Sequence, residues 1–241
     1  MLERSSLLSA VPGLCHGFTN RLGGVSTGRF TSLNLGRKWG DAAEAVDENL
    51  RRVAQAGGYN PATLRRVKQV HGGVVLEATA LTEGSEADGL WCRDGDGVTV
   101  AVSTADCVPV LIADREGTVA AAVHSGWRST VARIAEAAVA ALGVEPTQLA
   151  AAIGPCIEVA AFEVGPEVAA QFDPAFVDMV SYAKPHVDLV GVVRGQLERA
   201  GLQPASIERV GTCTHAHPDR YFSYRRDGAG TGQMMSFVGY L

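Results

Sequence analysis

The sequence has no long hydrophobic run, no signal-peptide core and no excess of positive charge. No apolar stretch among its 241 residues approaches the roughly 18 residues that span a bilayer. Its 26 acidic and 21 basic side chains give a net charge of −5, whereas a dedicated nucleic-acid binder is expected to be basic. We therefore expect neither a membrane nor a nucleic acid as a partner.

The sequence also lacks a paired cysteine motif. Its five cysteines are scattered, odd in number and without a C-x-x-C pair. This pattern does not fit a disulfide scaffold and indicates free thiols in a reducing compartment. We predict a cytoplasmic protein and expect it to be a monomer.

No internal repeat, low-complexity tract or polar linker divides the chain. At roughly 150 residues per domain, the length allows one large domain or two small ones. We predict a single domain over residues 1–241. Apolar residues make up 46% of the chain and charged residues 20%, which excludes a disordered protein.

Hydrophobic patterns predict strands and helices that intermix without strict alternation. Helices are expected over 41–57, which Asp41 would cap, and over 131–142 and 187–200. The β-branched run 98–102 is typical of a strand buried on both faces. Further strands are expected over 67–70, 74–77, 107–113, 118–124, 149–153 and 207–213. This order predicts an α/β layered sandwich of mixed β-sheet flanked by helices, rather than a TIM barrel or a doubly wound sheet.

The runs 107–113 and 118–124 predict a β-hairpin around a four-residue turn, 114–117. In that register paired residue numbers sum to 231, so Cys107 faces His124 with Cβ atoms ~4.5–5.5 Å apart. Such a pair suits two ligands of one zinc ion or a thiolate–imidazole catalytic pair. A buried cysteine beside a core histidine is the third interpretation.

His71 is the candidate third ligand. It ends a strand-like stretch and precedes Gly72 and Gly73, which allow another chain segment to approach closely. Two histidines and one cysteine leave one tetrahedral position open, as in catalytic rather than structural zinc sites. Because His71 is far from the hairpin in sequence, spacing alone leaves a plain turn histidine as the alternative.

Other polar residues could bind anions or a metal. Arg21 precedes two glycines whose N–H groups could contact an anion. Arg225 lies among aromatic residues and could hold phosphate while its neighbours stack on a base. A plain turn and a surface strand are the respective alternatives. His215 and His217 form the single H-x-H of the chain, but a proline follows at once, so a polar loop is preferred there.

Seven motifs occur along the chain in the same order as in the laccase-domain family, and together they make the chain resemble that family. Members of this family are called multicopper polyphenol oxidases, purine nucleoside phosphorylases or peptidoglycan editing factors. The resemblance extends from about residue 16 to the end of the chain. The motifs are FTNRLGGVS (18–26), SLNLG (32–36), QVHG (69–72), ADCVP (105–109), HSGWR (124–128), IGPCI (153–157) and YFSYRR (221–226).

The resemblance implies an enzyme that phosphorolyses adenosine, inosine, guanosine and methylthioadenosine and deaminates adenosine. It implies zinc on His71, Cys107 and His124, which we take as the catalytic residues, in a sandwich similar to that of some cysteine hydrolases. The expected partners are a purine nucleoside and phosphate, for which we assign Arg21 and Arg225 as binding residues. Copper is less favoured, because a multicopper cluster needs many paired imidazoles and the chain has six histidines.

The chain departs from the family pattern in two places. Ser125 and Ser129 stand where H-A-G-W-R-G is usual, and Gln233 stands where T-G-R is usual. Because glutamine cannot replace the charge of arginine, phosphate affinity is the property most affected. Asp106 is a candidate acid–base group, although on an ideal strand it faces away from Cys107, so a structural role fits equally.

Two other functions are compatible with these residues. Cys107 and His124 could form a metal-independent amide hydrolase that acts on peptidoglycan precursors. A copper-dependent polyphenol oxidase is the other alternative. A purely structural zinc fits poorly, because such a site is expected to have four protein ligands.

Overall fold

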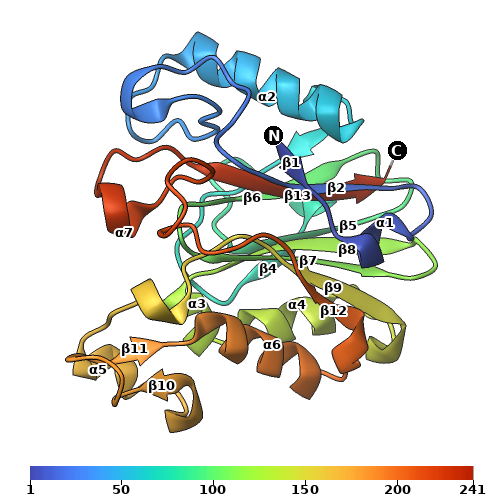
Figure 1. The fold of residues 1–241 in the computed structure, drawn as a ribbon. Coiled ribbons are helices and arrows are strands. Elements are labelled where there is room, and N and C mark those ends of the chain that lie inside the picture. The colour runs from blue at the N-terminus through green and yellow to red at the C-terminus, as the bar shows by residue number, and fades with distance from the viewer. Residues whose placement is uncertain (241) are drawn as a thin grey trace.

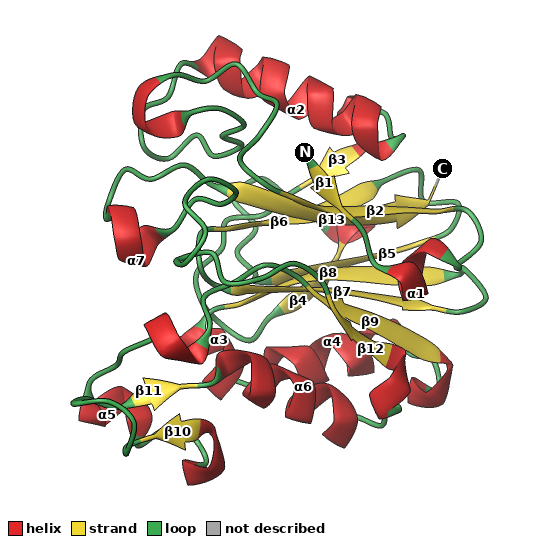
Figure 2. Cartoon of the chain, in the orientation of Figure 1, coloured by secondary structure: helices red, strands yellow, loops and turns green. Residues whose placement is uncertain are grey.

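A computed structural model describes residues 1–240, in which two large β-sheets are stacked between layers of helices and a separate two-stranded sheet lies outside them (Figures 1 and 2). The five-stranded sheet has the order β1 (Leu2–Glu3), β2 (Leu14–Thr19), β13 (Met234–Tyr240), β6 (Thr99–Thr104) and β3 (Leu64–Arg65). The six-stranded sheet has the order β12 (Ile207–Arg209), β9 (Leu149–Ile153), β7 (Val108–Asp114), β8 (Val119–Ser125), β5 (Gly89–Arg93) and β4 (Val75–Glu77). Both sheets contain parallel and antiparallel pairs, so the predicted mixed α/β sandwich is confirmed.

Helices cover the outer faces of both sheets (Figure 1). Helix α2 (Ala43–Gly57) lies over the five-stranded sheet, and α4 (Ile134–Leu142) and α6 (Leu189–Arg199) lie over the six-stranded sheet. No helix within residues 1–240 is both long and apolar enough to cross a bilayer. The short elements are α1 (Ser6–Ser9), α3 (Trp127–Val131), α5 (Pro166–Ala169), α7 (Tyr224–Asp227), β10 (Val177–Asp178) and β11 (His186–Val187).

Successive side chains along a strand point to opposite faces of its sheet, which explains how the layers pack. In β6, Val100 and Val102 belong to the core between the sheets, whereas Ala101 packs with residues of α2. In β7, Leu111 faces the same inter-sheet core and Val110 faces the core beneath α4 and α6. Residues 98–102 are therefore buried on both faces of the sheet, as predicted.

Some boundaries differ from the sequence predictions. Helix α2 begins at Ala43, because the Asp41 carboxylate instead accepts hydrogen bonds from the side chains of Ser26 and Asn34. The expected helix 131–142 begins only at Ile134, as α4, because Arg133 adopts a left-handed conformation (φ 60°), and Val131 is instead the last residue of α3. Residues 67–70 form no strand and contribute only an isolated bridge at Lys68.

The hairpin forms, but its register differs from the prediction by two residues. Pro109, not Cys107, pairs with His124. The reason lies in the turn, where the Asp114 carboxylate accepts hydrogen bonds from the backbone N–H groups of Thr118 and Val119 and so draws Thr118 out of the ladder. A shift of two residues keeps every side chain on its original face, so His124 still faces the inter-sheet layer at the end of β8.

Candidate metal centre

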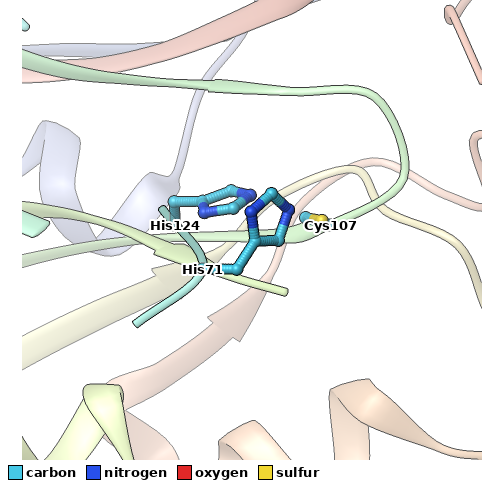
Figure 3. Close-up of side chains that lie close together, drawn as sticks. All are labelled: His71, Cys107 and His124. Atoms are coloured by element: carbon cyan, nitrogen blue, oxygen red, sulfur yellow. The ribbon is translucent and has the colours of Figure 1, made fainter. Parts of the chain in front are cut away.

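His71, Cys107 and His124 converge at one edge of the sandwich (Figure 3). One ligand atom of each residue lies within 4.8 Å of the others, and no other such group of three occurs among residues 1–240. The imidazole rings meet edge-on, with centroids 4.8 Å apart. His124 is 3% exposed, Cys107 is half-buried and His71 is exposed, so the site opens to solvent beside His71.

His124 is fixed by a carboxylate that the sequence analysis did not identify. Its Nδ1 atom lies 2.8 Å from Oδ1 of Asp88, and its backbone N–H donates to the Asp88 carbonyl at 2.7 Å. Because Nδ1 is engaged, Nε2 is the atom left to face the other two side chains. A carboxylate behind a histidine ligand is the usual way of setting its tautomer and raising its basicity.

Asp88 also shapes the loop that carries His71. Its carboxylate accepts the backbone N–H groups of Val70 (3.2 Å), His71 (3.0 Å) and Gly72 (2.6 Å). His71 thereby adopts a left-handed conformation (φ 61°), which costs energy for a non-glycine residue and is concentrated at functional sites. One fully buried carboxylate thus positions both histidines.

Against the effect of burial, Asp88, His124 and Cys107 shift one another's pKa values toward their charged forms. Burial opposes ionisation of Asp88, but the hydrogen bonds from His124 and Gly72 outweigh it and lower the pKa of Asp88 below its usual value. Burial likewise raises the pKa of Cys107, but the imidazoles of His124 and His71 overcome this effect and bring that pKa to about 6. The pKa of His124, which burial lowers, is raised by Cys107 and Asp88 to about 9. The thiol is therefore ionised at neutral pH, which is the form that binds a metal.

Gly126 lies so close to the three side chains that no other side chain fits at its position. A Cβ atom at Gly126 would lie 2.9 Å from Cδ2 of His71 and 3.1 Å from Sγ of Cys107. Two imidazole nitrogens and a thiolate are a donor set that zinc prefers. The residues therefore fit a tetrahedral zinc site with one open position.

Asp106 holds the loop beside Cys107 rather than facing the triad. Its carboxylate accepts hydrogen bonds from Oγ1 of Thr214 (2.5 Å), Oγ of Ser223 (3.0 Å) and the backbone N–H of Arg225 (2.7 Å). Asp106 itself has a left-handed backbone (φ 98°). These contacts favour the structural interpretation of Asp106, which ties Cys107 to the segment of Arg225.

A cavity of about 930 Å³ adjoins the triad. Arg225 lines it, and its guanidinium lies 5.3 Å from the centre of the Phe162 ring. Trp127 and Arg128 of α3, which directly follow Gly126, also line it. The cavity therefore combines aromatic faces and cations next to the candidate ligands.

The structure does not bring Arg21 to this cavity. The Arg21 guanidinium donates to the carbonyls of Thr31 and Pro218, both at 2.8 Å, and stacks on Phe222. His215 and His217 likewise lie outside the triad, in a segment without helix or strand.

Gln233, by contrast, lines the cavity, with its side chain packed against Gly36. Asp88 and Gly126 were not predicted from the sequence as parts of the site. Asp88 could not be recognised because three of its four partners are backbone N–H groups, which any sequence supplies.

Comparisons with known proteins agree with this architecture. A family model described as multi-copper polyphenol oxidoreductase laccase matches residues 15–241. A Deinococcus radiodurans protein named purine nucleoside phosphorylase is 39% identical over 241 residues, covering 95% of this chain and 89% of its own. The Escherichia coli protein named purine nucleoside phosphorylase YfiH is 37% identical over 91% of each chain. The crystal structure of Neisseria meningitidis protein NMB0706 has a TM-score of 0.87 at 35% identity and covers 100% of this chain and 98% of its own.

Proposed function

The chain belongs to the multi-copper polyphenol oxidoreductase laccase family, and on that premise we propose that it is a zinc-dependent purine nucleoside phosphorylase with adenosine deaminase activity. The proposed substrates are adenosine, inosine, guanosine and methylthioadenosine, together with phosphate. Relatives at 37–39% identity that are named purine nucleoside phosphorylase support the first activity. The observation that carries the proposal is the His71–Cys107–His124 cluster beside a cavity that contains both aromatic and cationic side chains.

His71, Cys107 and His124 would hold the zinc ion. When bound, zinc supplies a Lewis acid with one position open to a substrate oxygen or to water. Asp88 keeps Nε2 of His124 turned toward the other two ligand side chains and holds the backbone of His71 in place. Asp106 fixes Cys107 relative to Arg225 through its three hydrogen bonds.

In phosphorolysis, a phosphate oxygen bonds to the anomeric carbon of the ribose while the bond to the purine N9 breaks. The products are a sugar 1-phosphate and the free base. The protein must hold the phosphate dianion against the ring, and Arg225 and Arg128 are the cations next to the triad that can do so. The Phe162 and Trp127 rings offer apolar faces for the purine.

In deamination, the oxygen of water adds to C6 of adenine and ammonia leaves, as in other zinc deaminases. Both reactions use the same three ligands, so they should be lost together. The free thiol of Cys107 requires a reducing compartment, and we propose the cytoplasm. The monomeric state stays a prediction.

Phosphate-dependent release of hypoxanthine from inosine tests the first activity, and phosphate-independent formation of inosine from adenosine tests the second. Elemental analysis of the purified protein should give zinc at about one ion per chain. Cys107→Ala should abolish both activities and zinc binding, whereas Cys92→Ala, which removes a thiol from the core between the sheets, should keep them. Activity that survives Cys107→Ala would contradict the assignment of the site.

One observation favours a second candidate function. Cys107, His124 and Asp88 are arranged like the nucleophile, base and orienting carboxylate of a cysteine hydrolase, and the pKa of Cys107, which burial raises, is lowered by His124 to about 6. A metal-independent amide hydrolase acting on peptidoglycan precursors would remain active in chelator and be blocked by thiol alkylation. The phosphorylase would be inactivated by the chelator and regain activity with zinc.

A multicopper oxidase finds less support. It needs several groups of histidine ligands, whereas the described residues 1–240 contain one group of three that includes a thiol.

A further inference from the structure

The cavity is strongly basic, although the chain as a whole carries a net charge of −5. Six of its lining residues are arginine or lysine and only one, Asp106, is acidic. The Asp106 carboxylate is already occupied by Thr214, Ser223 and Arg225. The six cations are Arg37, Lys38, Arg66, Lys68, Arg128 and Arg225. Because charge of one sign is collected here, the cavity is built for anionic ligands.

Most of these cations have no acidic partner of their own. Two of the six are in ion pairs, Arg37 with Asp47 and Lys68 with Glu86. The other four have no carboxylate within ion-pair distance among residues 1–240 (Lys38, Arg66, Arg128 and Arg225). An isolated cation inside a cavity is stabilised when an anion binds, and arginine is particularly suited to phosphate.

Five of the six cations form two groups at opposite ends of one extended segment, and the sixth, Lys68, lies within that segment. Arg128 and Arg225 belong to segments that adjoin the triad, whereas Arg66 lies five residues before His71. The stretch between Arg66 and His71 stays extended along β6, because β3 pairs with that strand and the Gln69 amide exchanges two hydrogen bonds with the Ser103 backbone. Arg65 pairs with Val100 and the Gln69 amide bonds to Ser103, so this stretch advances three residues, about 10 Å, along β6 and separates Arg66 from the ligands.

Arg66 is the central residue of this far group. Its Nη1 atom donates to the Leu35 carbonyl at 3.0 Å, next to Gly36 and Arg37. Burial and the neighbouring charge of Arg37 both lower the pKa of Arg66, although a guanidinium stays charged at neutral pH. Arg37 is exposed and already paired with Asp47, whereas the half-buried Arg66 has no carboxylate partner among the described residues, so the missing anion is one for Arg66. Gln233, the polar side chain nearest to Gly36, is neutral and cannot supply it.

We propose that Arg37, Lys38 and Arg66 form a second anion subsite, which binds the 5′-phosphate of a purine nucleotide. The inference rests on the proposed function, because it places the purine and ribose between this subsite and the triad. The phosphate co-substrate is assigned to Arg128 and Arg225. The anion that binds Arg37, Lys38 and Arg66 must therefore be a second phosphate, one that is part of the purine ligand itself. A nucleoside 5′-monophosphate should therefore bind more tightly than the nucleoside and compete with it.

Titration calorimetry of the purified protein with AMP, adenosine and inorganic phosphate tests this subsite. We expect AMP to bind at least tenfold more tightly than adenosine, and Arg66→Gln to remove that advantage while adenosine affinity changes less than twofold. Arg65→Gln is the matched control: it makes the same change one residue away on a strand, at a side chain that bonds to Ala62 and Leu64 and does not line the cavity. Lys38→Gln, at an exposed position where folding is not at risk, should weaken AMP about threefold.

Steady-state phosphorolysis of inosine separates this subsite from the phosphate co-substrate site. We expect Arg66→Gln to leave the KM for inorganic phosphate within twofold, and AMP to inhibit the wild type more strongly than the variant. A tenfold rise in that KM, or AMP binding no tighter than adenosine in the wild type, would overturn the inference. AMP binding that depends on Arg66 in a protein without phosphorolysis would uphold the subsite and reject the proposed function.

Discussion

His124 and Asp88 are joined by a hydrogen bond of 2.8 Å between Nδ1 and Oδ1, and the same oxygen accepts the backbone N–H of His71 at 3.0 Å. One carboxylate therefore sets the direction of one imidazole and the backbone conformation beneath the other. The two histidines come from segments more than 50 residues apart in sequence, so Asp88 couples two distant parts of the chain.

Replacing Asp88 by asparagine should weaken zinc binding 10–100-fold, the usual effect of losing a carboxylate behind a histidine ligand. The amide keeps the shape of the carboxylate but cannot accept hydrogen bonds with both of its terminal atoms. Competition for zinc with a chromophoric chelator measures the affinity. Asp96→Asn is the control, because Asp96 also accepts a backbone N–H, from Arg93, in a turn away from the cavity. Unchanged zinc affinity in the Asp88 variant would refute its positioning role.

Gly126 is expected to tolerate no side chain. Because a Cβ atom there would lie within 3.1 Å of both His71 and Cys107, Gly126→Ala should force the ligands apart and remove zinc binding and activity together. The metal content and the melting temperature of the variant are the measurements. Gly195→Ala in α6 is the matched control, since its nearest neighbour is the mobile end of Arg199 at 3.3 Å. The control should keep its zinc and gain up to ~1 kcal/mol of stability; zinc retained by the Gly126 variant would contradict the proposed geometry.

In metal-free protein, Cys107 should be the thiol that iodoacetamide modifies first. Burial raises the pKa of Cys107, but His124 and His71 lower it by more, to about 6. Burial raises the pKa values of Cys92 and Cys156 to about 12. The alkylation rate of Cys107 should therefore be constant above pH 7 and fall as the pH drops through about 6. Mass spectrometry of the modified peptides follows each thiol separately.

His124→Ala removes the charge that keeps Cys107 ionised, so it should shift this alkylation profile upward, toward the ordinary thiol pKa of about 8.5. Zinc added before the reagent should protect Cys107 in the wild type. A rate profile that does not move in the variant would show that His124 is not the stabilising group.

The proximity of Cys107 and His124 could be predicted from the sequence, because alternate side chains of a strand lie on the same face of the sheet. The predicted hairpin placed Cys107 and His124 on one face, and they remain there because the actual register differs by two residues rather than by one. The exact pairing could not be predicted, since it depends on how the Asp114 side chain folds over the turn. His71 was a weak candidate from its own neighbourhood and was supported mainly by the family motif, because its approach depends on the long-range contact to Asp88.

Arg21 shows where prediction from the local sequence fails. Its position beside two glycines is typical of an anion site, but only the fold reveals that its guanidinium is engaged by the carbonyls of Thr31 and Pro218. The paired cysteine and histidine could be inferred from local strand geometry. The cations of the cavity come from several loops whose meeting point no local pattern specifies.

His16 should make the protein less stable as the pH falls. It is 1% exposed in β2, its Nε2 atom accepts the backbone N–H of Ser5 at 3.1 Å, and its Nδ1 atom has no hydrogen-bond partner among the described residues. Burial, reinforced by the charge of Arg4, lowers its pKa from 6.5 to about 4. Between these two values the unfolded chain takes up a proton that the folded chain does not, so the free energy of unfolding decreases by about 3 kcal/mol from pH 7 to pH 4. The amide oxygen of the His16→Gln variant can still accept the Ser5 hydrogen bond. Measured by urea unfolding, its free energy of unfolding should fall by about 3 kcal/mol less than that of the wild type between pH 7 and pH 4. Equal falls in the two proteins would show that His16 is not the titrating group.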